Sequence, residues 1–350
     1  MDNTKKQNGI IMKGVGGLYT VRPYLNGVPG DPVICTARGR FRLDGVTPLT
    51  GDDVLFERDT DAAPPEEQEA GEARFVITDL LERRNTLVRP PLANLSHVFL
   101  LIPAARPKPD LITADKLTAI LESEGIEPVI VACKLDAGRA EAERIRDTYR
   151  RAGFSSFAVS SVTGEGCDGL MEYISGVAAD GAAAGVPARA AVAGVSGAGK
   201  STLLKRLFPE LDLRAGAVSR KTERGRHTTR TTELYPLSAG GAPFLFADTP
   251  GFSMLDFTRF TFFMPEDLPL YFREFADCLG KCRYTKCTHL REEGCAVLEK
   301  MEAGGVPVSR HDGYVRIFEE LKQKPLWKRE KEAAARAPGK TGGDGRTGRK

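Results

Sequence analysis

The residues from Gly194 to Ser201 have types and spacing that suit them to hold the phosphates of a nucleotide. Gly194 and Gly199 bracket four residues, and Lys200-Ser201 follows, which completes the P-loop pattern. Glycines let the backbone turn tightly, so that successive N–H groups converge on phosphate oxygens. We expect the Lys200 ammonium to neutralise the β and γ phosphates as a catalytic group, and the Ser201 hydroxyl to ligate Mg²⁺. The predicted nucleotide contacts of this loop are Gly194, Val195, Ser196, Gly197, Ala198, Gly199, Lys200, Ser201 and Thr202.

The residues on either side of this loop give it the context that the pattern requires. A short apolar run at residues 189–193 precedes the loop and predicts a strand, and residues 202–208 predict the start of a helix. The alternative is a Gly/Ala/Ser-rich linker, which is how we interpret residues 181–185 just upstream. The complete pattern in a strand-loop-helix context favours phosphate binding.

A Lys-x-Asp triplet earlier in the chain could read a guanine base. The Asp136 carboxylate can accept from both N1–H and the 2-amino group of guanine, a pairing that adenine cannot offer, and the Lys134 stem would cover the base. The backbone that follows the next predicted strand, at Ser160 and Ser161, could meet the base oxygen O6. Such a triplet alone is usually the start of a surface helix. Here it follows a buried strand, so we predict a guanine pocket that also includes Cys133.

Two segments after the P-loop are expected to complete a Mg²⁺-triphosphate site. Asp248 ends an apolar strand that begins near residue 243, and its carboxylate would reach Mg²⁺ directly or through water. The hydroxyl of Thr228 or Thr229 would complete the shell of the ion, and the Gly251 N–H would approach the γ phosphate. A polar loop without a ligand is the alternative for the two threonines.

A cysteine cluster near the C-terminal end indicates a metal site. Four of the seven cysteines fall between Cys278 and Cys295, and an odd count without a visible secretion signal argues against a disulfide framework. Three cysteines and one histidine make a closed tetrahedral donor set that is typical of structural zinc. We expect one Zn²⁺ and interpret Cys278 as a buried neighbouring thiol, the alternative being reduced, unrelated cysteines. The predicted ligands are Cys282, Cys287, His289 and Cys295.

The patterning of the chain predicts which elements carry these residues. Residues 9 to about 85 contain short alternating runs separated by Gly, Pro and Asp, as in a small β-barrel. From residue 93, buried strands alternate with helices, which predicts a doubly wound parallel sheet with ligands at the carboxyl ends of its strands. The barrel strands are predicted at 17–21, 33–37 and 53–56, the sheet strands at 98–105, 128–132 and 156–159, and the helices at 115–124, 140–151 and 314–322.

Basic residues at the two ends of the chain suggest a nucleic-acid partner. Arg38, Arg40 and Arg42 are two residues apart, so on a strand they would share one face and present three cations to an RNA backbone. A solvated outer strand face is the alternative. Residues 326–350 carry eight Lys or Arg against three Asp or Glu, and we expect this tail to be disordered until it meets RNA. A purely solubilising tail is the alternative.

The order of the motifs resembles a known family. P-loop GTPases usually carry the phosphate loop before the Lys-x-Asp element, whereas here the latter comes first, so the domain looks circularly permuted. With a barrel before it and a cysteine cluster after it, the sequence resembles the ribosome small-subunit-dependent GTPase A family. The resemblance implies a multidomain α/β protein with an N-terminal barrel of the oligonucleotide-binding type, a permuted P-loop GTPase core and a mainly helical zinc-binding domain. It further implies late maturation of the small (30S) ribosomal subunit, with GTP hydrolysis stimulated by that subunit.

Two positions depart from the patterns of known GTPases. The family's base motif usually opens with Asn, which braces the pocket against the P-loop, whereas this chain has Cys133. Reduced guanine affinity is therefore expected. In Ras-like GTPases a Gln orients the attacking water, but here Phe252 follows Gly251. His227 is the nearest catalytic candidate, because a neutral imidazole can orient water. The alternatives are that His227 is a polar loop residue or that the group comes from the partner.

The sequence divides into four predicted parts. They are a barrel at 1–88, the GTPase core at 89–258, the zinc-binding domain at 259–325 and the tail at 326–350. No apolar run reaches the roughly 20 residues of a membrane span, so we expect a cytoplasmic protein. We also expect a monomer, and the resemblance implies that its partners are GTP or GDP, the small subunit and its rRNA. Nearness of the γ-phosphate loop to the zinc-binding domain suggests that hydrolysis reorients that domain. The alternatives are an rRNA assembly scaffold without significant turnover and, if Cys133 spoils guanine selection, an ATPase.

Overall fold

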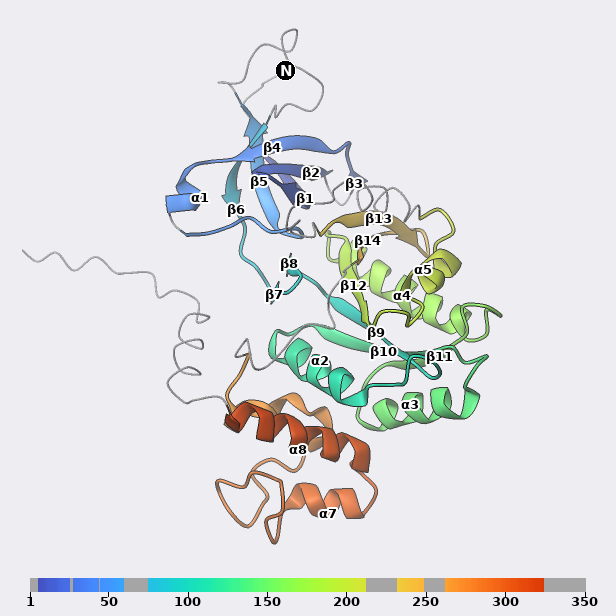
Figure 1. Cartoon of the computed structure of the whole chain (residues 1–350). Coiled ribbons are helices and arrows are strands. Elements are labelled where there is room, and N and C mark those ends of the chain that lie inside the picture. The colour runs from blue at the N-terminus through green and yellow to red at the C-terminus, as the bar shows by residue number, and fades with distance from the viewer. Residues whose placement is uncertain are drawn as a thin grey trace, which may run out of the picture.

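Five N-terminal strands close into a barrel in the computed structural model, which describes residues 6–25, 28–43, 45–59, 75–211, 232–248 and 262–323 (Figure 1). The ring runs β1-β5-β6-β4-β2 and closes because β2 also pairs with β1. Alternate residues point inward, and Ile11, Val21 and Phe56 are fully buried there. The barrel consists of β1 (Gln7–Val15), β2 (Leu18–Leu25), β4 (Val33–Ala37), β5 (Asp53–Arg58) and β6 (Phe75–Leu80), and β3 (Val28–Pro29) extends β2. The predicted barrel is confirmed.

The arginine-rich segment after β4 differs from the prediction. β4 ends at Ala37 and a short helix, α1 (Arg40–Leu43), follows, so Arg38, Arg40 and Arg42 do not lie along one strand face. Two of these cations are also paired, since Arg38 contacts Glu57 and Arg40 contacts Asp79. The predicted shared strand face is wrong because the alternation of Arg with other residues is compatible with a strand as well as with one helical turn.

A six-stranded sheet forms the centre of the molecule, with the order β11-β10-β9-β12-β14-β13. Neighbouring strands from β11 to β14 are parallel, and the edge strand β13 is antiparallel to β14. A hairpin of β7 (Thr86–Val88) and β8 (Pro91–Ala93) leads into it from the barrel. The strands are β9 (His97–Pro103), β10 (Glu127–Cys133), β11 (Ser156–Val159), β12 (Ala188–Gly194), β13 (Leu234–Ala239) and β14 (Ala242–Asp248).

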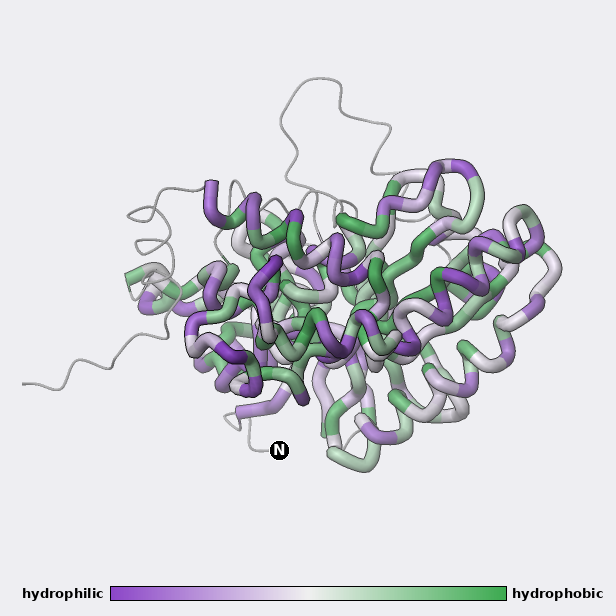
Figure 2. The backbone as a smooth tube through the Cα atoms, turned by 90° about the horizontal axis from the view of Figure 1, so that it is seen from below, coloured by the Kyte–Doolittle hydropathy of each residue, from purple (hydrophilic) through white to green (hydrophobic). Residues whose placement is uncertain are grey.

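Helices cover both faces of this sheet, which confirms the doubly wound arrangement. Alternate strand residues enter two separate cores, one with α2 (Leu111–Ser123) and α3 (Arg139–Arg151), the other with α4 (Cys167–Ala183) and α5 (Lys200–Leu207). Hydrophilic and hydrophobic residues alternate along the helices, as amphipathic packing requires (Figure 2). The predicted linker at 181–185 is wrong in part, because α4 continues to Ala183.

The C-terminal part packs on the α2 side of the sheet (Figure 1). Its elements are η2 (Pro265–Tyr271), η3 (Arg273–Phe275), α7 (Ala296–Glu302) and α8 (Val308–Gln323). One continuous hydrophobic core joins Ile10 of the barrel, Ile120 of α2 and Tyr314 of α8. Within the residues that the structure describes, no helix combines the length and the apolar character that crossing a bilayer requires. The C-terminal part therefore shares its core with the domain that carries the P-loop.

Candidate nucleotide-binding site and metal centre

The P-loop lies at the carboxyl end of β12 and leads into α5. A Cβ at Gly194 would lie 2.7 Å from the carbonyl oxygen of Leu101 on β9, so only glycine fits this approach. Lys200 Nζ donates to the carbonyl oxygens of Gly194 at 2.7 Å and Val195 at 3.1 Å. Ser196, Gly197, Ser201 and Thr202 are exposed, whereas Ala198 in the middle of the loop is fully buried. The loop is thus fixed by the hydrogen bonds of Lys200 and by the buried Ala198, while its exposed residues are open to solvent, as phosphate binding requires.

Of the residues after the P-loop that are predicted to complete the Mg²⁺ side of the site, the structure describes only the backbone of Asp248. Asp248 ends β14 and pairs in register with Val192 of β12, two residues before Gly194. The strand register therefore brings Asp248 to the same edge of the sheet as the P-loop. The Asp248 side chain and the whole of His227, Thr228, Thr229 and Gly251 lie outside the described residues. Their roles remain predictions.

The base-reading residues meet at the carboxyl ends of β10 and β11. Lys134 follows β10 with a positive φ of 64°, and its Nζ donates to the carbonyl oxygen of Gly197 at 2.8 Å. Ser160 Oγ donates to Asp136 Oδ1 at 2.5 Å and accepts from the Thr163 N–H at 3.1 Å. Asp136 is exposed and Ser161 is half-buried. The fold therefore brings together three elements that are far apart in the sequence. They are the Lys-x-Asp element, the loop that contains Ser160 and Ser161, which we call the serine loop, and the P-loop.

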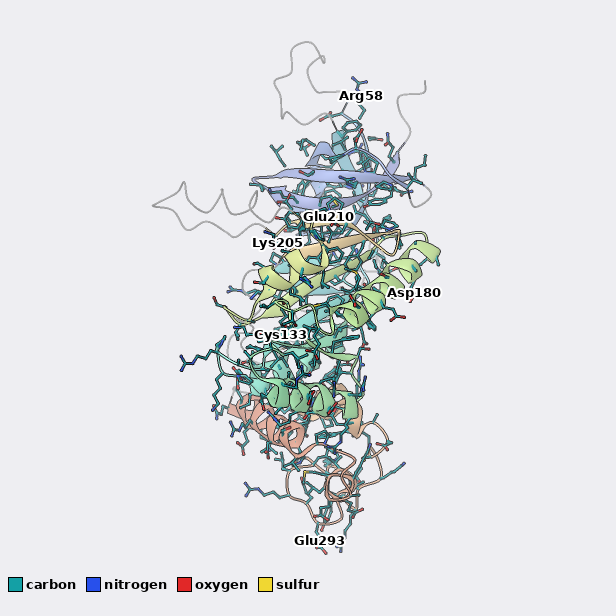
Figure 3. The ribbon with its side chains drawn as sticks, turned by 90° about the vertical axis from the view of Figure 1, so that its right-hand side faces the viewer. Arg58, Cys133, Asp180, Lys205, Glu210 and Glu293 are labelled. Atoms are coloured by element: carbon teal, nitrogen blue, oxygen red, sulfur yellow. The ribbon has the colours of Figure 1, made fainter. Side chains whose placement is uncertain are left out.

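Cys133 contacts the P-loop directly. Its Sγ lies 3.1 Å from the carbonyl oxygen of Ala198, and only 2 % of the residue is exposed. Burial raises the pKa of this thiol to about 12, so the sulfur keeps its proton and can donate. Figure 3 shows Cys133 where the yellow-green ribbon of the P-loop region meets the green ribbon of the base-reading strands. A bracing contact to the P-loop is thus present although the residue is not Asn.

Sequence reasoning missed the loop between β9 and α2. The carbonyl oxygen of Arg106 accepts a second hydrogen bond from Lys134 Nζ, and the Pro107 ring lies 3.7 Å from where a Cβ of Gly197 would be. The side chains of Arg106 and Lys108 are exposed at this rim. The signal that could have found them is their place after the carboxyl end of a central parallel strand, where ligands of such sheets bind.

Three cysteines and a histidine of the loop between η3 and α7 come together. The ligand atoms of Cys282, Cys287, His289 and Cys295 all lie within 4.8 Å of one another. His289 Nδ1 is 3.5 Å from the Sγ atoms of both Cys282 and Cys295. Burial lowers the pKa of His289, which favours the neutral imidazole that metals bind. This cluster could hold a metal ion.

The loop that carries these ligands is fixed by neighbouring hydrogen bonds. Glu292 accepts from the backbone N–H groups of Thr288 at 2.7 Å and Leu290 at 2.9 Å. Burial alone would raise the pKa of Glu292, but hydrogen bonds from Thr288 and the backbone lower it to about 2. From α8, His311 Nε2 lies 2.8 Å from the His289 carbonyl oxygen, and Tyr314 donates to that of Thr288 at 2.7 Å. The donor set is therefore preformed, and its chemistry fits zinc.

Known proteins are similar to this chain in both sequence and fold. The family model described as RsgA GTPase matches residues 80–258, and that of the RsgA N-terminal domain matches residues 8–63. The chain is 38% identical over 321 residues to "Small ribosomal subunit biogenesis GTPase RsgA" of Geobacillus thermodenitrificans, covering 90% of this chain and 98% of that protein. The protein of the same name from Moorella thermoacetica is 37% identical over 313 residues, covering 89% and 97%.

Two solved structures have the same architecture. The crystal structure of YjeQ from Thermotoga maritima matches with a TM-score of 0.71 and 29% identity, covering 92% of this chain and 100% of that chain. YloQ, described as a circularly permuted GTPase, matches with a TM-score of 0.67 and 27% identity, covering 93% of this chain and 98% of that chain. The permuted order inferred from the motifs is thereby confirmed.

Proposed function

This chain belongs to the RsgA GTPase family, and from that premise we propose that it hydrolyses GTP in the late maturation of the small (30S) ribosomal subunit. It binds that subunit and its rRNA, and the subunit stimulates its turnover. The observation that carries the proposal is that hydrogen bonds join the base-reading element to the P-loop. Cys133 donates to the carbonyl oxygen of Ala198, and Lys134 donates to that of Gly197. The names of the relatives, which refer to small ribosomal subunit biogenesis, support the choice of partner.

The residues of the site have separate tasks in this proposal. Asp136 accepts from the guanine N1–H and 2-amino group, while its contact to Ser160 keeps the carboxylate in place. The serine loop at Ser160 and Ser161 lies beside the base. The P-loop N–H groups hold the phosphates, and Lys200 exchanges its loop carbonyl partners for phosphate oxygens, where it stabilises charge that develops during transfer.

Mg²⁺ would neutralise phosphate charge when it is bound with GTP. Its proposed protein ligands are Ser201 at the start of α5, Asp248, and Thr228 or Thr229. The register of β12 and β14, which places the Asp248 backbone beside the P-loop strand, supports this set. The Gly251 N–H is proposed to approach the γ phosphate.

We assign His227 the orientation of the attacking water, because Phe252 stands where Ras-like GTPases have Gln. The variant His227→Ala should bind GTP and GDP as the natural chain does and should lose stimulated turnover. Turnover equal to that of the natural chain would refute the assignment.

The remaining parts of the proposal concern the domains around the core. We propose zinc as the ion of the Cys282, Cys287, His289 and Cys295 cluster, because a closed set of thiolates and imidazole suits that metal. Arg38, Arg40 and Arg42 are proposed to contact rRNA phosphates. The barrel is assigned to 1–88, the core to 89–258, the zinc-binding part to 259–325 and the basic tail to 326–350. We further propose that the chain is a monomer and that it works in the cytoplasm, where ribosomal subunits mature.

The deciding experiment measures GTP and ATP turnover by the purified chain with and without isolated small subunits. We expect slow GTP hydrolysis that rises sharply with subunits, and no response with ATP. Tight subunit binding without stimulation would instead support the scaffold without significant turnover. Preferential ATP hydrolysis would contradict the role of Asp136.

A further inference from the structure

Two buried thiols contact the two loops that line the base site. Cys133 ends β10, and its Sγ donates to the Ala198 carbonyl oxygen of the P-loop at 3.1 Å. Cys167 begins α4, and its Sγ donates to the Ser160 carbonyl oxygen of the serine loop at 3.5 Å. Both residues are at most 5 % exposed. Each loop of the pocket is therefore anchored to the core by one sulfur.

The strand register explains how these two thiol contacts could replace the contacts of a single amide side chain at position 133. Cys133 pairs in register with Val159 of β11, and Val159 is followed directly by Ser160. A side chain at position 133 therefore lies between the P-loop and the serine loop. The partner atoms in both loops are carbonyl oxygens, so an amide there, with two N–H donors, could bond both loops, whereas a thiol has one proton and bonds one. In this chain the serine loop receives its donor from Cys167 instead.

The chemistry of both thiols suits a permanent hydrogen bond rather than reactivity. Burial raises the pKa of both Cys133 and Cys167, so each sulfur stays protonated and donates. Within the serine loop, the Gly164 N–H also donates to Ser160 O at 2.9 Å. The bond from Cys167 links this locally closed turn to α4. Loss of the Cys133 bond is expected to cost more, because it is the direct tie between β10 and the P-loop.

We propose that Cys133 and Cys167 are positioning residues that together brace the guanine pocket of this chain, dividing between two thiols the role of one amide at position 133. The brace holds Asp136 and the P-loop at a fixed separation, so that base and phosphates are bound at once. This inference rests on the proposed binding of guanine nucleotides and does not depend on the ribosomal partner.

Binding of GDP and inosine diphosphate to the purified full chain tests the brace. Inosine lacks the 2-amino group that Asp136 reads, so the ratio of the two affinities reports how well the carboxylate is placed. Cys133→Val keeps an apolar side chain without a donor and should weaken GDP binding about fivefold, the effect of one hydrogen bond, and lower the ratio. Cys167→Ala should weaken GDP binding about two- to threefold. Cys35→Ala, which removes a buried thiol of the barrel, is the control and should leave both affinities unchanged.

The decisive arm is a rescue. Cys133→Asn supplies an amide that can reach both loops, so the double variant Cys133→Asn/Cys167→Ala should bind GDP within about twofold of the natural chain. A double variant as weak as Cys167→Ala alone would overturn the divided brace. So would a Cys133→Val variant with unchanged affinity and ratio. If the valine variant does not fold, Cys133→Ser and Cys133→Ala are compared instead. The serine variant keeps a hydrogen-bond donor and should bind GDP more tightly than the alanine variant.

Failure of the brace can be told apart from failure of the proposed function. If the natural chain binds neither GDP nor GTP, or prefers ADP, the proposed function itself is wrong. If the natural chain prefers GDP and the cysteine variants are neutral, only the brace is wrong.

Discussion

Arg310 of α8 donates from Nη1 to Asp115 Oδ1 of α2 across 2.6 Å, and the two side chains are 1% and 2% exposed. The same guanidinium donates from Nε to Glu274 Oε1 across 2.6 Å. Its Cζ also lies 4.5 Å from the centroid of the Phe272 ring. One buried cation thus joins the C-terminal part to the GTPase core. We expect the C-terminal part to move with α2, which makes a free swing on hydrolysis unfavourable.

Replacing Arg310 should destabilise the whole chain. Arg310→Met leaves Asp115 and Glu274 buried without their cation, which typically costs about 3–5 kcal/mol in the free energy of unfolding. Arg316→Met, on an exposed position of the same helix, is the matched control and should change that free energy by less than about 0.5 kcal/mol. Denaturant unfolding of the two variants measures both values. Equal stabilities would show that the cluster does not hold the domains together.

The same cluster predicts a pH dependence of stability. Burial is the largest cause that raises the pKa of Asp115 to about 6, and the charge of Arg310 opposes it. The groups that face Asp115 are Arg310 of α8, Tyr149 of α3 and Glu274 of η3. Because the folded chain holds this proton more tightly than the unfolded one, the contribution to stability is complete below the ordinary value of 3.8 and is lost as the pH rises through about 6.

Asp115→Asn isolates this effect, because the amide cannot titrate. The stability of the natural chain relative to this variant should fall between about pH 4 and pH 7 in denaturant unfolding. A difference that is constant over that range would show that Asp115 titrates near its ordinary value.

Removing a ligand of the cysteine cluster should release the metal and loosen the C-terminal part. Cys282→Ser takes away one donor of four, and structural zinc supplies folding free energy directly. Elemental analysis should find one zinc per natural chain and little in the variant, and the melting temperature should fall. Cys278→Ser is the control, because its Sγ contacts Asp277 and is not part of the cluster. Equal loss of metal from both variants would mean that the ligand set is wrong.

An amide at position 136 should change which base the site accepts. Asp136→Asn replaces one acceptor by a donor, which pairs with the 2-oxo group of xanthine and not with the 2-amino group of guanine. The affinity for GDP should fall at least about tenfold while that for xanthosine diphosphate rises. Competition binding with both nucleotides measures the exchange. Unchanged preference for GDP would place the base elsewhere.

Local patterns were sufficient to predict several strands and most motifs, but not β1, β6 or β13. The predicted strand at 33–37 coincides with β4, and that at 156–159 coincides with β11, since turn residues bracket both runs. The P-loop, the Lys-x-Asp triplet and the cysteine cluster are sequence-local signals, because backbone geometry and metal chemistry impose their spacing. The permuted order was readable for the same reason.

Contacts between distant segments could not be predicted in this way. The family resemblance placed position 133 against the P-loop, but the residues around Cys133 do not show that its sulfur meets Ala198, because that contact depends on the strand order of the finished sheet. The pairing of Arg310 with Asp115 likewise depends on how α8 crosses α2. The helix at Arg40–Leu43 was missed because a single turn carries too few residues to establish a period.

The continuous core from Ile10 to Leu321 has a consequence for how the chain is made. Synthesis proceeds from the N-terminus, so the base-reading loops and the P-loop are complete when residue 211 has been added, long before the final helix exists. Until then the apolar residues of α2 that pack against α8 are exposed to solvent, and a nascent chain of this length presents a hydrophobic surface that is prone to aggregation. We expect chaperones to bind at this stage and to leave once α8 has been translated.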